Sequence, residues 1–323
     1  MDINNIFSDA QKRFSQNCAE IYEFQYQNNP IYQKWVNLIG PDASFKMIPG
    51  LIPSLPIHCF KDFEVVTGSF SPEKVFESSG TTGMITSKHL VKSLNIYEQS
   101  FLQSFQLFYG DIRDWCVLAL LPAYLERDTS SLVYMADHLI KKSGHPKSGF
   151  YLYNHVELNE TIQQLEQIEQ KTILLGVTFA LLDFSMAFSQ QLKHTIVMET
   201  GGMKGRGKEL TKLELHHILC NNFGVETIHA EYGMTELLSQ AYSTGNGRYV
   251  CPPWMKVMVQ SEDDPLLIQT TGIGLLIIID LANIYSCCFI ATQDIAKVFD
   301  DGSFEVLGRM DHSDLRGCSL MVV

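Results

Sequence analysis

A short run of hydroxyl residues and glycines, residues 78–83 (SSGTTG), has the composition of a phosphate-binding loop. Glycines let the backbone turn several N–H groups toward one point, and such a concave arrangement binds anions. The apolar pair Val75 and Phe76 precedes the run, and an amphipathic segment at about 93–108 follows it. We therefore predict the order strand, loop, helix, in which phosphates are commonly held. A flexible serine–threonine linker is the alternative interpretation.

A second segment with the residue types of a nucleotide site spans residues 230–236 (AEYGMTE) and follows a predicted strand. Ligands of open parallel sheets bind beyond the carboxyl ends of the strands, so a loop here is well placed. Tyr232 is suited to lie against a purine ring, and Thr235 can donate to a phosphate. Glu236 offers the hard oxygen ligand that Mg²⁺ prefers. The alternative is a buried tyrosine and a surface glutamate.

The composition restricts the class of protein and its partners. The chain has 323 residues, of which 46% are hydrophobic and 19% charged, and its formal net charge is −12. These values indicate a globular protein and disfavour nucleic acid or anionic membranes as partners. The N-terminal residues lack the pattern of a signal peptide, and the longest apolar run, 275–279, is too short to span a bilayer. We expect a cytoplasmic protein without a membrane span.

The eight cysteines are scattered and include no Cys-x-x-Cys pair. Without a secretion signal, thiols are expected rather than disulfides, and a zinc site is not expected.

Strands and helices alternate through the middle of the chain, which predicts crossover connections and a mainly parallel sheet. The expected strands are 116–121, 172–177, 195–198 and 227–230, and the expected helices are 131–142, 159–170, 178–188 and 208–222.

After about residue 254 the pattern changes to short antiparallel strands, with a hairpin turn at 300–302. We therefore divide the chain into an α/β body, 1–253, and a β-rich subdomain with a C-terminal tail able to move, 254–323.

Four segments, in this order and spacing, resemble the adenylate-forming enzymes, which activate a carboxylate with ATP to an acyl-adenylate. They are residues 79–83, 232–236, 290–294 and 308–311. The resemblance implies ATP and Mg²⁺ as cofactors and Glu236 as the metal ligand. It implies ribose contacts from Asp294 and Arg309. The implied nucleotide-binding residues are Ser79, Gly80, Thr81, Thr82, Gly83, Gly201, Gly202, Tyr232, Gly233, Thr235, Asp294 and Arg309.

A closer resemblance, to the acyl-protein synthetases of the LuxE type, covers nearly the whole chain. The segments that carry it are 55–57 with 60–61, 201–206, 231–237, 280–283 and 316–318. It implies that a fatty acid is activated as acyl-AMP and then carried as a thioester on Cys318. The acyl group would pass to a partner protein such as a reductase or carrier. A buried, inert thiol is the alternative for Cys318, although the nearby Arg316 favours a thiolate.

The implied fold is α/β and of the type found in the N-terminal part of adenylate-forming enzymes. It has mainly parallel sheets with helices and a C-terminal antiparallel β subdomain. The printed chain ends at Val323, shortly after Arg309, so the lysine-bearing C-terminal domain of typical members is expected to be missing. Either Lys204 or Lys88 can supply a positive charge in its place, and we assign Lys204 with Cys318 to catalysis.

Two further features are less specific. Residues 202–208 have Walker-type spacing, but Glu209 stands where Mg²⁺ binding needs serine or threonine. We interpret this segment as a basic glycine loop capping a helix from Lys208. The histidines, among them His58, His229 and His312, are interpreted as structural.

Three functions are consistent with these patterns. The first is an acyl-protein synthetase, and the second is an acyl- or aryl-CoA ligase of the phenylacetate type. The third is a non-catalytic nucleotide-binding protein.

Overall fold

The computed structural model describes residues 4–40, 52–78, 86–121, 128–201, 210–261, 264 and 267–310. The chain forms two compact units. Unit 1 combines Met1–Ser69 with Pro253–Val323, and unit 2 is Phe70–Pro252. Each unit has its own main β-sheet, and the two are described separately below.

The main sheet of unit 2 has the strand order β5-β4-β6-β7-β8-β9, and all neighbours are parallel except β8 and β9. This confirms the predicted parallel sheet. The strands are β4 (Cys116–Leu120), β5 (Gly149–Phe150), β6 (Thr172–Val177), β7 (Thr195–Thr200), β8 (His229–Tyr232) and β9 (Ala241–Ser243).

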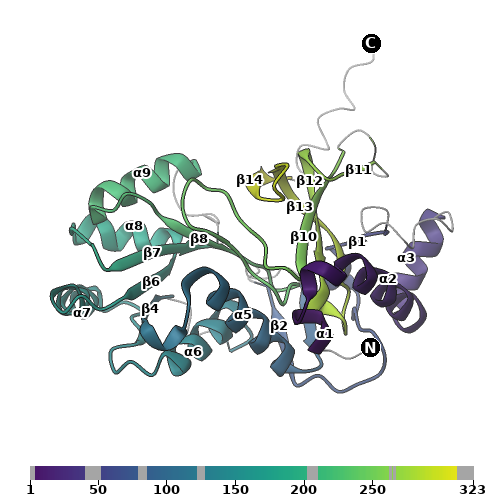
Figure 1. Cartoon of the computed structure of the whole chain (residues 1–323), viewed down its shortest axis with the longest axis horizontal. Coiled ribbons are helices and arrows are strands. Elements are labelled where there is room, and N and C mark those ends of the chain that lie inside the picture. The colour runs from purple at the N-terminus through teal and green to yellow at the C-terminus, as the bar shows by residue number, and fades with distance from the viewer. Residues whose placement is uncertain are drawn as a thin grey trace, which may run out of the picture. The chain divides into compact units, whose positions relative to one another are not determined.

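Helices cover both faces of this sheet (Figure 1). Apolar side chains of α7, α8 and α9 pack with β4, β6 and β7 in one buried cluster, and α5 and α6 lie on the opposite face. The helices of unit 2 are α5 (Leu94–Tyr109), α6 (Ser131–Ser143), α7 (His155–Gln167), α8 (Thr178–Ala187) and α9 (Lys212–Phe223), with a 3₁₀ turn at η3 (Ile112–Asp114).

Helix ends in unit 2 follow local capping chemistry. Gly144 and Gly224 adopt left-handed backbone angles after α6 and α9, as expected for C-terminal glycines. The start predicted for α9, Lys208, is wrong, because Thr211 and Glu214 form a capping box that begins the helix at Lys212. Similarly, Asn154 caps α7, which begins at His155, four residues before its predicted start.

The segment around the Ser/Gly/Thr run forms a hairpin. Strand β2 (Lys74–Glu77) pairs antiparallel with β3 (Lys88–Val91), and α5 begins only after β3. The predicted order of strand, loop and helix is therefore wrong. A second strand separates the run from the helix, because 88–91 is long enough to pair with β2. The helix N-terminus that we expected beside the loop does not directly follow it.

Unit 1 is built on a mainly antiparallel sheet of order β1-β13-β12-β10-β11, with β14 paired to β13. Its strands are β1 (Leu55–Pro56), β10 (Met255–Gln260), β11 (Ile268–Gln269), β12 (Gly272–Asp280), β13 (Phe289–Val298) and β14 (Phe304–Arg309). The antiparallel strands expected after residue 254 and the 300–302 turn are thus present. The helices are α1 (Asn4–Phe7), α2 (Ala10–Asn28), α3 (Pro30–Ile39), α4 (Cys59–Asp62) and the 3₁₀ turn η5 (Leu281–Asn283).

Residues 1–69 belong with the C-terminal sheet rather than with the parallel sheet, so unit 2 does not coincide with the expected body, 1–253. One reason is that β1 pairs with β13, with Leu55 opposite Ile290. Another is Gln25 of α2, whose amide nitrogen donates to the carbonyl oxygens of Asn283 and Ile284 at 3.0 and 3.1 Å.

Two further expectations concern cysteines and membranes. No disulfide joins the seven cysteines within the described residues. Among the helices that the structure describes, none combines the length and apolar character needed to cross a bilayer.

Candidate functional site

The carboxyl ends of β7 and β8 bring several polar side chains to one edge of the parallel sheet of unit 2. Strand β7 ends with Glu199 and Thr200, and β8 ends with Glu231 and Tyr232, which pair as neighbouring parallel strands. Gly201 follows β7 with a positive φ of 73°. Its carbonyl oxygen accepts a hydrogen bond of 3.0 Å from Thr178 at the start of α8. This edge is where parallel α/β sheets bind ligands.

Residues that flank the Ser/Gly/Thr run contact the loop after β8. The ring of His89, on β3, lies with Nδ1 2.9 Å from the carbonyl oxygen of Thr235. On the next helix, α5, Ser100 hydrogen-bonds Ser239 at 2.9 Å between their Oγ atoms. Two segments that are about 150 residues apart in sequence are thus held together inside unit 2. The base of the β2–β3 hairpin and the 233–239 loop therefore lie side by side.

Glu236, the predicted metal ligand, is only 7% exposed. The alternative interpretation of a surface glutamate is therefore wrong. Burying a carboxylate is costly unless other groups compensate its charge. A buried carboxylate in the loop beyond β8 suits a Mg²⁺ ion, which uses one or two protein carboxylates and takes its other ligands from phosphates and water. In the described part of the chain, no three Asp, Glu, His or Cys side chains gather as a metal cluster.

Gly233 lies against the side chain of Glu231. A Cβ atom at position 233 would lie 2.6 Å from Oε1 of Glu231. The hydroxyl of Thr200 donates to Oε2 of the same carboxyl group, which fixes it in place. A side chain at 233 would therefore have to displace a buried, hydrogen-bonded group. Glycine at this position allows the chain to turn closely over the end of β8.

The two acids of this edge have opposite protonation tendencies. Burial, together with the charge of Glu199, raises the pKa of Glu231 to about 7, although the Thr200 hydrogen bond opposes the rise. Burial also acts to raise the pKa of Glu199, but the contacts with His216 and Lys212 outweigh it and lower the pKa. Lys212 Nζ lies 3.1 Å from Oε1 of Glu199. The edge therefore combines an ionised acid with one whose raised pKa keeps it protonated below about pH 7.

Tyr232 is buried, as the alternative interpretation proposed, with its ring 5.6 Å from that of Tyr249 between centroids. The ammonium of Lys212 lies 4.3 Å from the centroid of the Tyr249 ring and contacts its hydroxyl. The tyrosine predicted to contact a purine is thus part of a packed aromatic and cationic group.

The two predicted ribose-binding residues, both in unit 1, lie opposite each other. Asp294 on β13 pairs with Arg309 on β14, and Arg309 Nε is 4.0 Å from the Asp294 carboxylate. The Asp294 side chain is 15% exposed and that of Arg309 53%. Gln293 also accepts a hydrogen bond of 3.4 Å from Arg309. Pairing of β13 with β14 thus brings together the two residues that the sequence predicted to bind ribose.

Several predicted site residues lie outside the described part of the chain. These are Ser79, Gly80, Thr81, Thr82, Gly83, Gly202, Lys204 and Cys318. Lys88, the alternative to Lys204, lies on β3 with an exposed side chain, opposite Glu77.

Sequence reasoning missed His89 and Glu231. Both are polar residues that are almost completely buried, with exposures of 1% and 6%. Glu231 stands next to Tyr232 in a segment already singled out, so its position beside the motif was a usable signal. His89 carried no such signal, because its role depends on a contact with a residue far away in sequence.

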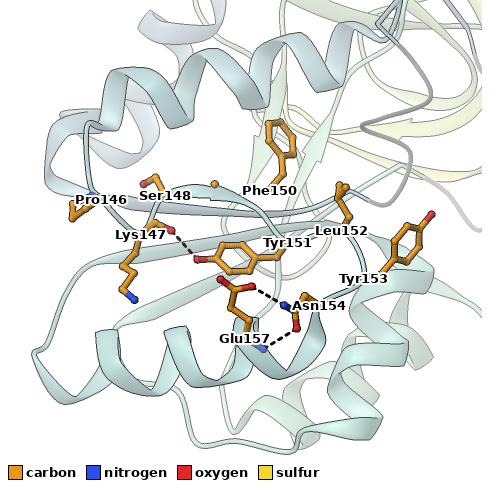
Figure 2. Close-up of a pocket in the computed structure, with 10 residues that line it drawn as sticks. Pro146, Lys147, Ser148, Phe150, Tyr151, Leu152, Tyr153, Asn154 and Glu157 are labelled. Carbon is orange, nitrogen blue, oxygen red and sulfur yellow. Dashed lines mark hydrogen bonds between the residues drawn. The ribbon is translucent and has the colours of Figure 1, made fainter.

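A separate hollow lies along β5, the edge strand of the sheet (Figure 2). Its volume is about 530 Å³, and its lining runs from Pro146 to Asn154 with Glu157. Asn154 Nδ2 donates to Glu157 at 2.7 Å, and the hydroxyl of Tyr151 donates to the carbonyl of Lys147 at 3.0 Å. Strand β5 is four strand positions from β8, or about 19 Å at the usual spacing. The hollow is therefore distinct from the edge formed by β7 and β8.

No protein-family profile matches this chain, and no curated protein matches it in sequence. Solved structures do resemble its fold. ATP-bound MatB from Rhodopseudomonas palustris has a TM-score of 0.55 and 14% identity, over 73% of this chain and 47% of that one. An open form of 2-hydroxyisobutyryl-CoA ligase, in complex with 2-HIB-AMP and CoA, has a TM-score of 0.67 and 9% identity, over 94% of this chain and 75% of that one. The luciferase-like enzyme of the mealworm Zophobas morio has a TM-score of 0.52 and 17% identity, over 76% of this chain and 60% of that one.

These similarities define the fold. The chain has the α/β architecture of the N-terminal domain of adenylate-forming enzymes, with its C-terminal β subdomain, as the sequence predicted. The chain spans about half the length of MatB and three quarters of the length of the 2-hydroxyisobutyryl-CoA ligase. At identities of 9–17%, the similarity concerns the fold and not the substrate.

Proposed function

We propose that the protein activates a carboxylic acid with ATP, forming an acyl-adenylate and pyrophosphate. The observation that carries this proposal is the contact between His89 and Thr235. It places the base of the Ser/Gly/Thr hairpin beside the loop that carries Thr235 and Glu236, at the ligand-binding edge of a parallel sheet. The fold, shared with ligases crystallised with ATP or an acyl-AMP, supports the same reaction.

In the proposed first step, a carboxylate oxygen of the acid attacks the α-phosphorus of ATP. The bond from this phosphorus to the bridging oxygen breaks, and pyrophosphate leaves. The backbone N–H groups and hydroxyls of 79–83, with Thr235, would hold the phosphates, and Lys204 would add a positive charge. Glu236 would hold Mg²⁺, which neutralises phosphate charge when bound. Gly201, Gly202, Tyr232 and Gly233 would contact the nucleotide, with Asp294 and Arg309 as the ribose-binding residues.

For the second step we propose the acyl-protein route implied by the LuxE resemblance. The Cys318 thiolate would attack the acyl carbonyl, and AMP would leave as the thioester forms. A partner protein would then accept the acyl group. We propose a fatty acid as the substrate, because apolar segments without compensating charge flank the nucleotide loops in the sequence.

An acyl- or aryl-CoA ligase is the second candidate function. The observation that favours it is the fold similarity to 2-hydroxyisobutyryl-CoA ligase, whose structure holds both 2-HIB-AMP and CoA. In this case free CoA, and not Cys318, would receive the acyl group.

Exchange of labelled pyrophosphate into ATP tests the first step, using short, medium, long and aromatic acids in turn. We expect acid-dependent exchange that requires Mg²⁺ and is strongest with long apolar acids. Preference for amino acids or dicarboxylates would contradict the proposed fatty acid. Nucleotide binding without exchange for any acid would instead favour the non-catalytic nucleotide-binding protein.

Acyl labelling distinguishes the two acceptors. With ATP and labelled acid, the wild-type protein should acquire a label that neutral hydroxylamine removes. Cys318→Ser should stay unlabelled while still forming acyl-adenylate, and Cys251→Ser serves as the matched thiol control. If Cys318→Ser labels normally, Cys318 is not the acyl acceptor. If CoA consumes the adenylate efficiently in this variant, the CoA-ligase function is correct instead.

A further inference from the structure

His89 is a buried ring on β3 that contacts the loop after β8, to which the proposed reaction assigns Thr235 and Glu236. It lies on β3, opposite Phe76 of β2, at the base of the hairpin that carries residues 79–83. Its side chain is 1% exposed. The ring reaches out of its own hairpin to the backbone of the 233–239 loop, where Nδ1 meets the carbonyl of Thr235.

The acceptor determines which nitrogen of the His89 ring carries the hydrogen. A carbonyl oxygen can only accept, so Nδ1 of His89 must carry the proton in this 2.9 Å contact. Burial lowers the pKa of His89 to about 4, although the hydrogen bond to Thr235 opposes the fall. The ring is therefore neutral at ordinary pH and holds a single tautomer, with its donor directed at the loop.

We infer that His89 is a positioning residue, whose Nδ1–H holds the carbonyl of Thr235 and thereby fixes where Thr235 and Glu236 stand beyond the carboxyl end of β8. The inference rests on the proposed function, since it concerns binding of Mg-ATP by the loop that carries Thr235 and Glu236. His89 itself is not assigned a contact with the nucleotide. It acts through the backbone of the residue that precedes the metal ligand.

This arrangement explains why a histidine occupies a buried position in a short strand. An apolar residue would pack there without a polar group to desolvate. The Nδ1 donor of His89 instead gives the exposed turn near Gly233 one hydrogen bond to a buried strand. Ser100 gives a second hydrogen bond, to Ser239. Displacing reacting groups by about 1 Å can cost about 100-fold in rate, so a fixed attachment has a direct effect on catalysis.

Two amide substitutions distinguish the effect of the Nδ1 donor from the effect of the side-chain volume. In His89→Asn the amide nitrogen is attached to Cγ, as Nδ1 is, so a donor stays at the same place. In His89→Gln the volume is closer to histidine, but the amide nitrogen lies one carbon further along. If only packing matters, glutamine is the better replacement, and if the donor matters, asparagine is.

The experiment measures Mg-ATP affinity by calorimetry and acid-dependent ATP–pyrophosphate exchange for the wild type, both His89 variants and Tyr109→Phe. The last is a matched control. It removes a hydroxyl bonded to another histidine, His229, at the opposite end of β8. We expect His89→Gln to lose about 10- to 100-fold in exchange and to bind Mg-ATP more weakly. His89→Asn should stay within about threefold of the wild type, as should Tyr109→Phe.

Other outcomes overturn the inference. It fails if both variants match the wild type, if both are equally impaired, or if the loss follows the unfolding temperature across the set. Wild-type protein that binds Mg-ATP without exchange would overturn the proposed reaction alone, and affinity would still decide the role of His89. Wild-type protein that does not bind Mg-ATP would overturn both.

Discussion

Buried polar groups serve different purposes in the two units. In unit 1, Gln25 and Asn29 of the α2–α3 region donate to carbonyl oxygens of the 283–286 turn, and Gln25 Oε1 accepts from Cys288 N at 3.0 Å. These are neutral amides with partners on the backbone. At the β7–β8 edge of unit 2, the buried polar groups include three carboxyls, of Glu199, Glu231 and Glu236, beside neutral groups such as Thr200.

The difference agrees with the proposed function, in which the acids of unit 2 lie at the reacting edge and the amides of unit 1 hold a turn. Neutral amides that satisfy a turn stabilise it at little cost, because no charge is desolvated. Asp280 of unit 1 is a buried acid, yet it too has a structural task, since it accepts from Ala282 N at the start of η5. Acids are costly to bury, and two of those at the β7–β8 edge are compensated within the protein. Lys212 and His216 lie beside Glu199, and Glu231 has a raised pKa and accepts from Thr200. The third, Glu236, is the proposed Mg²⁺ ligand.

The largest effect should come from Glu236→Gln. This change keeps the shape of the side chain but removes its charge, so we expect exchange to fall by about 100- to 1,000-fold, with little change in stability. The exposed Glu226→Gln, shortly before β8 in the same unit, is the matched control. Exchange at the wild-type rate in Glu236→Gln would show that Glu236 is not a metal ligand in this reaction.

The next effect concerns Glu231 and pH. Its pKa is raised to about 7 in the folded protein by burial and by Glu199. The folded state therefore keeps a proton that the unfolded state loses, and stability falls as pH rises from about 4.5 to about 7. We expect this group to account for about 3 kcal/mol of that fall.

Urea unfolding at several pH values checks this prediction. The groups around the carboxyl are Glu199 and Thr200 on β7, Tyr97 and Tyr109 on α5, and Tyr242 on β9. Glu231→Gln should remove the dependence, whereas Glu160→Gln, at an exposed position, should follow the wild type. Parallel curves for wild type and Glu231→Gln would show that Glu231 ionises normally.

In unit 1, Gln25→Ala should destabilise the fold by about 2 to 3 kcal/mol, because several backbone groups of the 283–288 turn lose their partner. Gln16→Ala, on the same helix, removes only an exposed bond to Glu20 and should cost less than about 0.5 kcal/mol. Chemical unfolding measures both. If Gln25→Ala proves as mild as Gln16→Ala, the structural role assigned to the amides of unit 1 is wrong.

The smallest effect should come from Asp294→Ala. A ribose contact contributes equally to ground and transition states, so we expect the KM for ATP to rise about tenfold with little change in kcat. Asp301→Ala is the control, since this residue accepts from Ser303 in the hairpin turn of the same unit. An unchanged KM for ATP in Asp294→Ala would show that Asp294 does not contact the ribose of the nucleotide.

The sequence predicted those elements whose signals are local. Strand β6 was predicted with its observed bounds, because Thr172–Val177 is an apolar run between polar residues. Gly144 and Gly224 marked two helix ends through their left-handed conformation. Pairing partners could not be inferred in this way. Strand β1 joins β13 from far away in sequence, and β3 is short enough to pass as a loop.

The same limit applies to the site. Tyr232, Thr235 and Glu236 could be selected because their types and order are informative within one segment. Their burial, and the choice between a surface and a buried Glu236, depend on what packs over them. The hydrogen bond of His89 to Thr235 joins strands that are distant in sequence, so only the fold reveals it.

Acid-dependent exchange of pyrophosphate into ATP by the wild-type protein is the most direct test of the central claim, that the carboxyl edge of unit 2 activates carboxylic acids. The account predicts exchange that requires Mg²⁺ and a carboxylic acid and falls by about 100-fold or more in Glu236→Gln. Absence of exchange with every class of acid, in protein that still binds Mg-ATP, would contradict it.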